Sequence, residues 1–152
     1  MNVSQKGIDL VKRFEGFISK AYLCPAGYLT AGYGHRENVT KDTVMTEEEA
    51  EILLKKDLNK FASKITYSLE QDKIKLNQNQ FDALCSFAFN LGYSALVFST
   101  LWKKLKQGDY EGASDEFLKW VYITKTVNNE RVKIRLKGLE TRRNAERDLF
   151  LS

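Results

Sequence analysis

Glu15 is the side chain in this sequence whose setting best suits acid catalysis. It lies between Phe14 and Gly16-Phe17, at the C-terminal end of a helix predicted to end near Gly16. The negative end of the helix dipole and the aromatic neighbours both disfavour a charged carboxylate. We therefore expect a raised pKa for Glu15, which would keep it protonated near neutral pH as a general acid requires. An ordinary exposed glutamate is the alternative interpretation.

Two further reactive side chains follow Glu15 closely. Cys24 and Thr30 lie nine and fifteen residues after it, in a stretch from 20 to 38 that is rich in Gly and Tyr. This composition predicts short strands and tight turns, and a hairpin would turn both side chains back towards the end of the helix. A thiol and a hydroxyl beside an acid could position or activate a nucleophile. Taken singly, Cys24 also fits a small buried hydrophobe and Thr30 an ordinary strand residue.

The elements that must hold these groups are mostly helices. Ser4 is predicted to cap the first helix, and Thr46 with Glu49 forms a capping box before a helix of about 20 residues. A helix from Asn77 to Gly92 is apolar on nearly every face and is expected to be buried. The remaining apolar periodicity predicts helices over 96–107, 109–120 and 139–150, with 123–131 as a polar loop and 20–38 as the only β region.

These elements predict an α+β, mostly helical fold with two lobes. A small lobe with a β-hairpin, about residues 14–60, would join a larger helical lobe, about 61–152, through the long helix, and the first helix would pack on the large lobe. We expect one catalytic domain spanning 1–152. A cleft between unequal lobes is a favoured place for a substrate site.

Composition excludes several other classes of protein. Apolar residues make up 43% and charged residues 29% of the 152, which is typical of a soluble globular chain and not of a disordered or membrane-spanning one. One His and two Cys are too few for the usual zinc sites, so no metal or other cofactor is expected. Scattered apolar residues near the N-terminus predict no signal peptide, and the two cysteines predict a reducing compartment.

The net charge of +4 is concentrated near the C-terminus. Residues 131–152 hold seven basic and three acidic side chains, and the other 130 residues are balanced. A basic segment can attract anionic polymers or membranes, although a solvated helix face is an equally good interpretation. A non-enzymatic binder of nucleic acid or membrane is therefore one alternative function. Against it, no nucleic-acid module is present, and Val132, Ile134 and Leu136 are expected in the core.

Three separated blocks of sequence carry a resemblance to a known family. The first contains Glu15, eight residues, Cys24, five residues and Thr30, followed by Gly32-Tyr33-Gly34-His35. The second runs from Asn77 to Gly92, and the third from Gly138 to Glu146. Together they resemble the phage-type lysozymes, or endolysins, of glycoside hydrolase family 24, and the similarity covers about residues 4–151. The resemblance implies a two-lobed α+β fold and cleavage of the β-1,4 bond between N-acetylmuramic acid and N-acetylglucosamine in peptidoglycan.

The resemblance also implies roles for individual residues. Glu15 would protonate the glycosidic oxygen and Thr30 would help to place the attacking water. Cys24 stands where many members carry Asp, so it would act as a thiolate, as a weak base or nucleophile, or only shape the site. The motif residues expected to bind substrate are Tyr33, Gly34, Asn90 and Gly92.

The resemblance further implies a cellular setting. The binding partner would be bacterial peptidoglycan. The protein would be a monomer that binds no nucleic acid and does not insert stably into membranes. The protein would wait in the host cytoplasm until a holin gives it access to the wall, and would then act in the periplasm and on the wall during lysis.

His35 supports a rival enzymatic interpretation. Cys24 and His35 could form a dyad, as in a peptidoglycan peptidase or amidase. The sequence offers no evident orienting residue for such a dyad, and we expect His35 to be structural, with its ring hydrogen-bonded to a carboxylate or the backbone. Arg142 and Arg143 are also expected to be structural, with their stems packed on the helical lobe.

Overall fold

The computed structural model describes residues 1–152, and its chain begins with the helix that carries Glu15. Helix α1 spans Gln5–Glu15 and ends at Gly16, whose φ of 71° lies in the left-handed region and whose N–H donates to the Lys12 carbonyl. Ser4 occupies the N-cap position, but the prediction that its side chain caps the helix is wrong. Its hydroxyl and its backbone N–H both donate to Asp82 on a neighbouring helix. This bond replaces a local cap with a tertiary contact.

The small lobe contains an antiparallel hairpin directly after α1. Strands β1 (Ile18–Leu23) and β2 (Leu29–Gly32) pair so that Tyr22 faces Thr30 and Leu23 faces Leu29. An irregularity between Ile18 and Tyr22 bends the first strand. Cys24 follows β1 directly, and its backbone N–H donates to the Tyr28 carbonyl at 2.9 Å, which closes the turn. The hairpin therefore returns the chain past the end of α1, as the sequence predicts.

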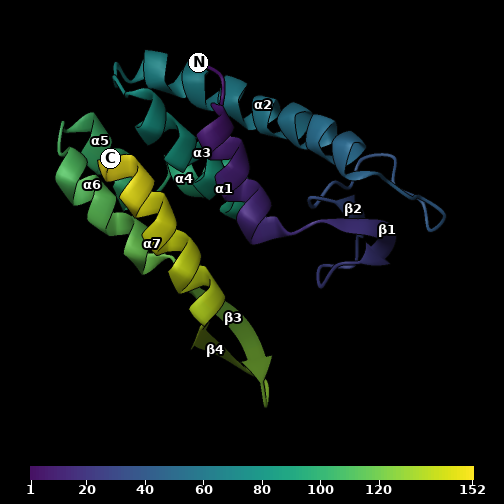
Figure 1. Ribbon diagram of the computed structural model, residues 1–152. Coiled ribbons are helices and arrows are strands. Elements are labelled where there is room, and N and C mark those ends of the chain that lie inside the picture. Colours follow the sequence, from purple (N-terminus) through teal and green to yellow (C-terminus); the bar gives the residue numbers. More distant parts are fainter.

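Helix α2 (Glu47–Gln71) connects the two lobes, and Figure 1 shows it running along the molecule from the hairpin to the helical part. The capping box predicted at Thr46 and Glu49 is present, and the helix is longer than expected, at 25 residues. The buried residues in the two halves of α2 belong to different hydrophobic cores. The first three belong to the small-lobe core and the last three to the large-lobe core: Ala50, Leu54 and Leu58, then Ala62, Ile65 and Leu69.

The large lobe is built around helix α3 (Gln78–Leu91). Asn77 and Gln80 form its capping box. The helix ends at Gly92 and every residue from Phe81 to Ala88 is buried, as the sequence predicts. Helices α1 and α7 (Lys137–Leu151) lie against it. None of the helices in the structure is both long enough and apolar enough to cross a membrane.

Two of the predicted helices in this lobe are broken. The predicted helix over 96–107 is two helices, α4 (Tyr93–Val97) and α5 (Thr100–Lys106), because the Ser99 hydroxyl accepts from the Trp102 backbone N–H and starts a new helix. The predicted helix over 109–120 stops early. It comprises α6 (Tyr110–Glu116) and a 3₁₀ turn over Phe117–Lys119.

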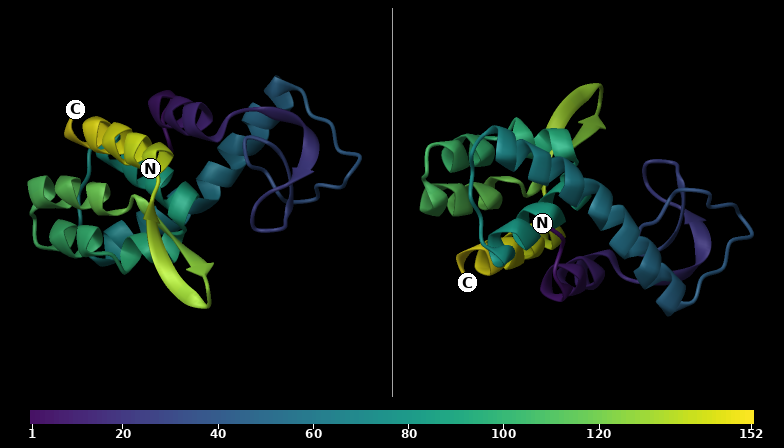
Figure 2. Two further views of the ribbon diagram at one scale, coloured as in Figure 1. Left: turned by 90° about the horizontal axis from the view of Figure 1, so that it is seen from below. Right: turned by 90° about the horizontal axis from the view of Figure 1, so that it is seen from above.

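A second hairpin corrects the prediction that 123–131 is a loop and 20–38 the only β region. Strands β3 (Tyr122–Val127) and β4 (Glu130–Arg135) pair in continuous antiparallel register. They project from the helices at the start of α7 (Figures 1 and 2). Val132 and Leu136 are 39% and 36% exposed, so the expectation that this segment supplies the core is also wrong. A two-stranded ribbon that stands clear of the helices has no partner against which to bury its side chains.

Candidate active site

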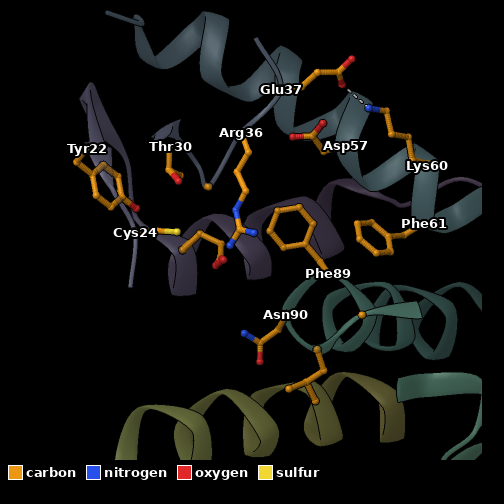
Figure 3. Close-up of a pocket in the computed structure, with 14 residues that line it drawn as sticks. Tyr22, Cys24, Thr30, Arg36, Glu37, Asp57, Lys60, Phe61, Phe89 and Asn90 are labelled. Atoms are coloured by element: carbon orange, nitrogen blue, oxygen red, sulfur yellow. Dashed lines mark hydrogen bonds and ion pairs between the residues drawn. The ribbon is translucent and has the colours of Figure 1, made fainter. Parts of the chain in front are cut away.

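A cleft between the lobes brings the three predicted catalytic residues to one cavity. Glu15, Cys24 and Thr30 all line a cavity of about 610 Å³, which the end of α3 and one face of α2 also border (Figure 3). Of the four residues predicted to bind substrate, Gly34, Asn90 and Gly92 line the same cavity. The end of α1, the hairpin and the end of α3 meet here although they lie far apart in the sequence.

Glu15 is the last residue of α1 and is held by a cation from the other end of the chain. One carboxylate oxygen lies 3.4 Å from Nη1 of Arg142 on α7, and the Glu15 side chain is 21% exposed. Gly34 has a φ of 78°, and a Cβ added there would lie 3.7 Å from Oε1 of Glu15. Glycine therefore keeps open the space beside the acid. The contact with Arg142 thus ties the end of α1, which carries Glu15, to α7.

Thr30 and Cys24 are fixed by the turn of the first hairpin. The Thr30 side chain is buried, and its hydroxyl donates to the Tyr28 carbonyl at 3.0 Å. The pKa of the Cys24 thiol is lowered, first by hydrogen bonding with the backbone of Tyr28 and to a smaller extent by the backbone of Ala26 and the Arg36 charge, while desolvation opposes the shift. The site thus shifts the equilibrium of Cys24 towards the thiolate, the form that can act as a nucleophile or base.

A buried network of charged side chains lies behind Glu15. The Glu146 carboxylate is fully buried and accepts from Ser86 Oγ at 2.5 Å, Arg143 Nη1 at 2.9 Å and Arg142 Nε at 3.3 Å. Arg143 also donates to the amide oxygen of Asn90. The two arginines therefore do more than pack their stems, because their charged groups link Glu15 and Asn90 to a common carboxylate in the core.

Two residues of the glycine-rich motif are not brought to the cavity. Tyr33, predicted to bind substrate, is buried in the small-lobe core, and its hydroxyl donates to Glu47 at 2.9 Å. His35 is also buried, with Nδ1 2.7 Å from the carboxylate of Asp57 on α2. Neither side chain lines the cavity, so the structure does not assemble a dyad of Cys24 with His35.

Several residues that line the cavity were missed by the sequence analysis. Arg36 and Glu37 follow the motif in the chain. Asp57 and Lys60 lie on α2, where charged residues indicate an ordinary solvated helix face. Glu37 and Lys60 form an ion pair at 2.6 Å. Arg36 and Glu37 carry only the signal of charge next to a motif, and Asp57 and Lys60 only that of charge on a helix. Neither signal distinguishes a cavity wall from open surface.

This arrangement defines the class of protein. Lysozyme-type hydrolases share the fold: the muramidase domain of SpmX from Asticaccaulis excentricus superposes with a TM-score of 0.89 at 32% identity, covering 99% of this chain and 98% of that one. The endolysin of Escherichia coli O157:H7 phage FAHEc1 superposes with a TM-score of 0.87 at 35% identity, covering 100% and 94%. The protein is thus a hydrolase of the lysozyme type.

The sequence comparisons identify the family. Residues 12–146 match the phage lysozyme family. The endolysin of Acyrthosiphon pisum secondary endosymbiont phage 1 is 48% identical over 153 residues, which cover 100% of this chain and 99% of that protein. The chain belongs to the phage lysozyme family, as its motifs predict. It is a lysis enzyme of the endolysin kind.

Proposed function

We propose that this lysozyme hydrolyses the β-1,4 bond between N-acetylmuramic acid and N-acetylglucosamine in bacterial peptidoglycan, with Glu15 as the general acid. The observation that carries this proposal is the convergence of Glu15, Cys24 and Thr30 on one cavity between the lobes. In the reaction, Glu15 gives its proton to the glycosidic oxygen as the bond to the sugar breaks. A water molecule then supplies the new hydroxyl of the sugar.

Thr30 suits the task of orienting that water. The hydroxyl proton is already donated to the Tyr28 carbonyl, so the oxygen is left with lone pairs that can accept a hydrogen bond from water. Cys24 supplies the second active group. As a thiolate it stabilises the positive charge that develops on the sugar ring or receives a proton from the water.

Asn90, Gly34 and Gly92 form the substrate-binding part of the proposal. Because Arg143 donates to the amide oxygen of Asn90, the amide NH₂ group is the part of Asn90 that is left to donate to a sugar hydroxyl or acetamido carbonyl. The two glycines leave room for a glycan chain to approach the backbone. Tyr33 has no part in this proposal because its side chain is buried away from the cavity.

The kinship with endolysins supports a cellular setting for this activity. We infer that the whole chain, 1–152, acts as one catalytic domain whose lobes divide near residue 60. It works as a monomer, stays in the host cytoplasm until a holin opens the inner membrane, and then reaches the wall.

The experiment that tests the proposed function identifies the ends produced from purified peptidoglycan. The wild-type chain should release reducing N-acetylmuramic acid ends, and a folded Glu15→Gln variant should release almost none. New free amines would instead indicate a peptidase or amidase, and anhydro sugars would indicate a lytic transglycosylase. Either result would refute the assignment.

A further inference from the structure

Arg36 stands in the cavity although the sequence motif ends before it. The residue follows His35 in the loop after β2 and lines the cavity with Cys24 and Thr30. Its guanidinium carbon lies 4.7 Å from the centre of the Tyr28 ring, and this stacking holds the side chain in place. Figure 3 shows the Arg36 side chain reaching from its loop into the cavity, towards the side on which Cys24 lies.

Most of the charged side chains that share the cavity with Cys24 have a polar partner. Five charged side chains line it, from the end of α1, from the loop after β2 and from α2: Glu15, Arg36, Glu37, Asp57 and Lys60. Glu15 pairs with Arg142, Glu37 pairs with Lys60, and Asp57 pairs with His35. Arg36 has no carboxylate within 4.0 Å, so it is the one cation lining the cavity that has no ionic partner in the structure.

An unpaired cation in the same cavity as a thiol has a defined chemical consequence. It favours loss of the Cys24 proton to solvent, because the thiolate then supplies the negative charge that the guanidinium lacks. No oxidation is involved and no covalent bond to carbon changes. The stacking on Tyr28 also matters, because the Tyr28 carbonyl accepts hydrogen bonds from Thr30 and from the Cys24 backbone. Arg36, Thr30 and Cys24 are therefore tied to one turn.

We propose that Arg36 is a positioning residue that holds Cys24 as a thiolate, so that the cavity presents a fixed negative charge opposite the general acid Glu15. This inference rests on the proposed role of Cys24. It explains how a cysteine can supply a negative charge at this position, where a carboxylate would be ionised at neutral pH without a neighbouring cation. Arg36 acts through Cys24 and need not touch the glycan.

The first test measures the thiol directly. The rate of alkylation of Cys24 by iodoacetamide is followed by mass spectrometry across pH 5.5 to 10 in the wild type, Arg36→Gln and Arg36→Lys. The control is Arg131→Gln, which makes the same charge change on the exposed second hairpin. Cys85 gives no background, because it is fully buried and burial raises the pKa of its thiol.

The expected result is a shift of the alkylation midpoint in Arg36→Gln alone. The midpoint should rise by about 0.5 pH units, the size of shift expected from removing one opposite charge in a water-like dielectric. The alkylation rate at pH 7 should fall about threefold for that shift. Arg36→Lys should keep most of the wild-type behaviour, and Arg131→Gln should keep all of it. An unchanged midpoint in Arg36→Gln would overturn the proposal.

The second test asks whether the effect of Arg36 on catalysis runs through the thiol. Arg36→Gln should lower kcat on purified peptidoglycan in the wild type, but not in a Cys24→Asp background, where the carboxylate is ionised at pH 7 in any case. An equal loss in both backgrounds would show that Arg36 binds substrate instead, and would refute the proposal. If Cys24→Ala kept full activity, the proposed role of Cys24 would fail, while the alkylation midpoint would still decide whether Arg36 controls the thiol.

Discussion

Replacing Glu146 by Gln should destabilise this lysozyme far more than replacing an exposed glutamate of the same helix. The Glu146 side chain is 0% exposed and accepts hydrogen bonds from Ser86, Arg142 and Arg143. Glutamine keeps the volume of the side chain but loses the charge. Its NH₂ group is a donor, and it would face the donors that now bond to a carboxylate oxygen. Two buried arginines would then lack their common counter-ion.

The magnitude follows from burial. Removing one partner of a buried ion pair costs about 3–5 kcal/mol, and the isosteric Gln should lie at the lower end, about 3 kcal/mol. For a chain of this size each kcal/mol moves Tm by about 2–4 °C, so Tm should fall by roughly 6–12 °C. Activity should fall as well, because Arg142 would keep Glu15 as its sole carboxylate partner.

The matched control is Glu140→Gln. Glu140 also lies on α7 and also pairs with an arginine, Arg135 at 3.2 Å, but the two side chains are 42% and 57% exposed. Exposed pairs contribute about 0–1 kcal/mol. The urea-induced unfolding of both variants is measured, and their free energies of unfolding are compared at equal m-values. Equal destabilisation of the two variants would refute the argument that the buried carboxylate holds the arginines in place.

Three further predictions concern activity. Glu15→Gln should lose at least roughly 10²-fold in activity with little change in Tm, because the amide cannot donate a carboxylic proton; wall lysis near the wild-type level would remove Glu15 as the acid. Cys24→Asp should retain substantial activity and resist thiol alkylation, whereas Cys24→Ala should lose most of it; full activity in Cys24→Ala would make the thiol structural. The basic segment 131–152 should attract anionic walls, so lysis of whole walls should fall as salt shortens the Debye length from about 10 Å at 0.1 M to about 3 Å at 1 M, while cleavage of a short neutral oligosaccharide should not. The double variant Lys133→Gln with Lys137→Gln should lose part of this salt dependence, and the control is the double variant Lys73→Gln with Lys75→Gln. If the two double variants showed the same salt dependence, Lys133 and Lys137 would belong to an ordinary solvated face.

Much of the fold was predictable because its signals are local. Capping boxes at Thr46 and Asn77 and the stop at Gly16 each depend on neighbours within four residues, and all three appear in the structure. The second hairpin also had a local signal that the sequence analysis missed. Asn128 and Asn129 have φ values of 51° and 65°, and they join two strands rich in β-branched residues.

The sequence by itself determined the order and type of the main elements, the family, and the spacing of Glu15, Cys24 and Thr30, because each of these follows from residues close together in the chain. The tertiary structure alone decided which charges meet. Arg142 reaches Glu15 across 127 residues, and His35 finds Asp57 across 22. It also decided that Arg36 has no ionic partner in the cavity and that the second hairpin stands clear of the core. Coulombic interaction and desolvation depend on distance and burial in space, and no pattern along the chain specifies either.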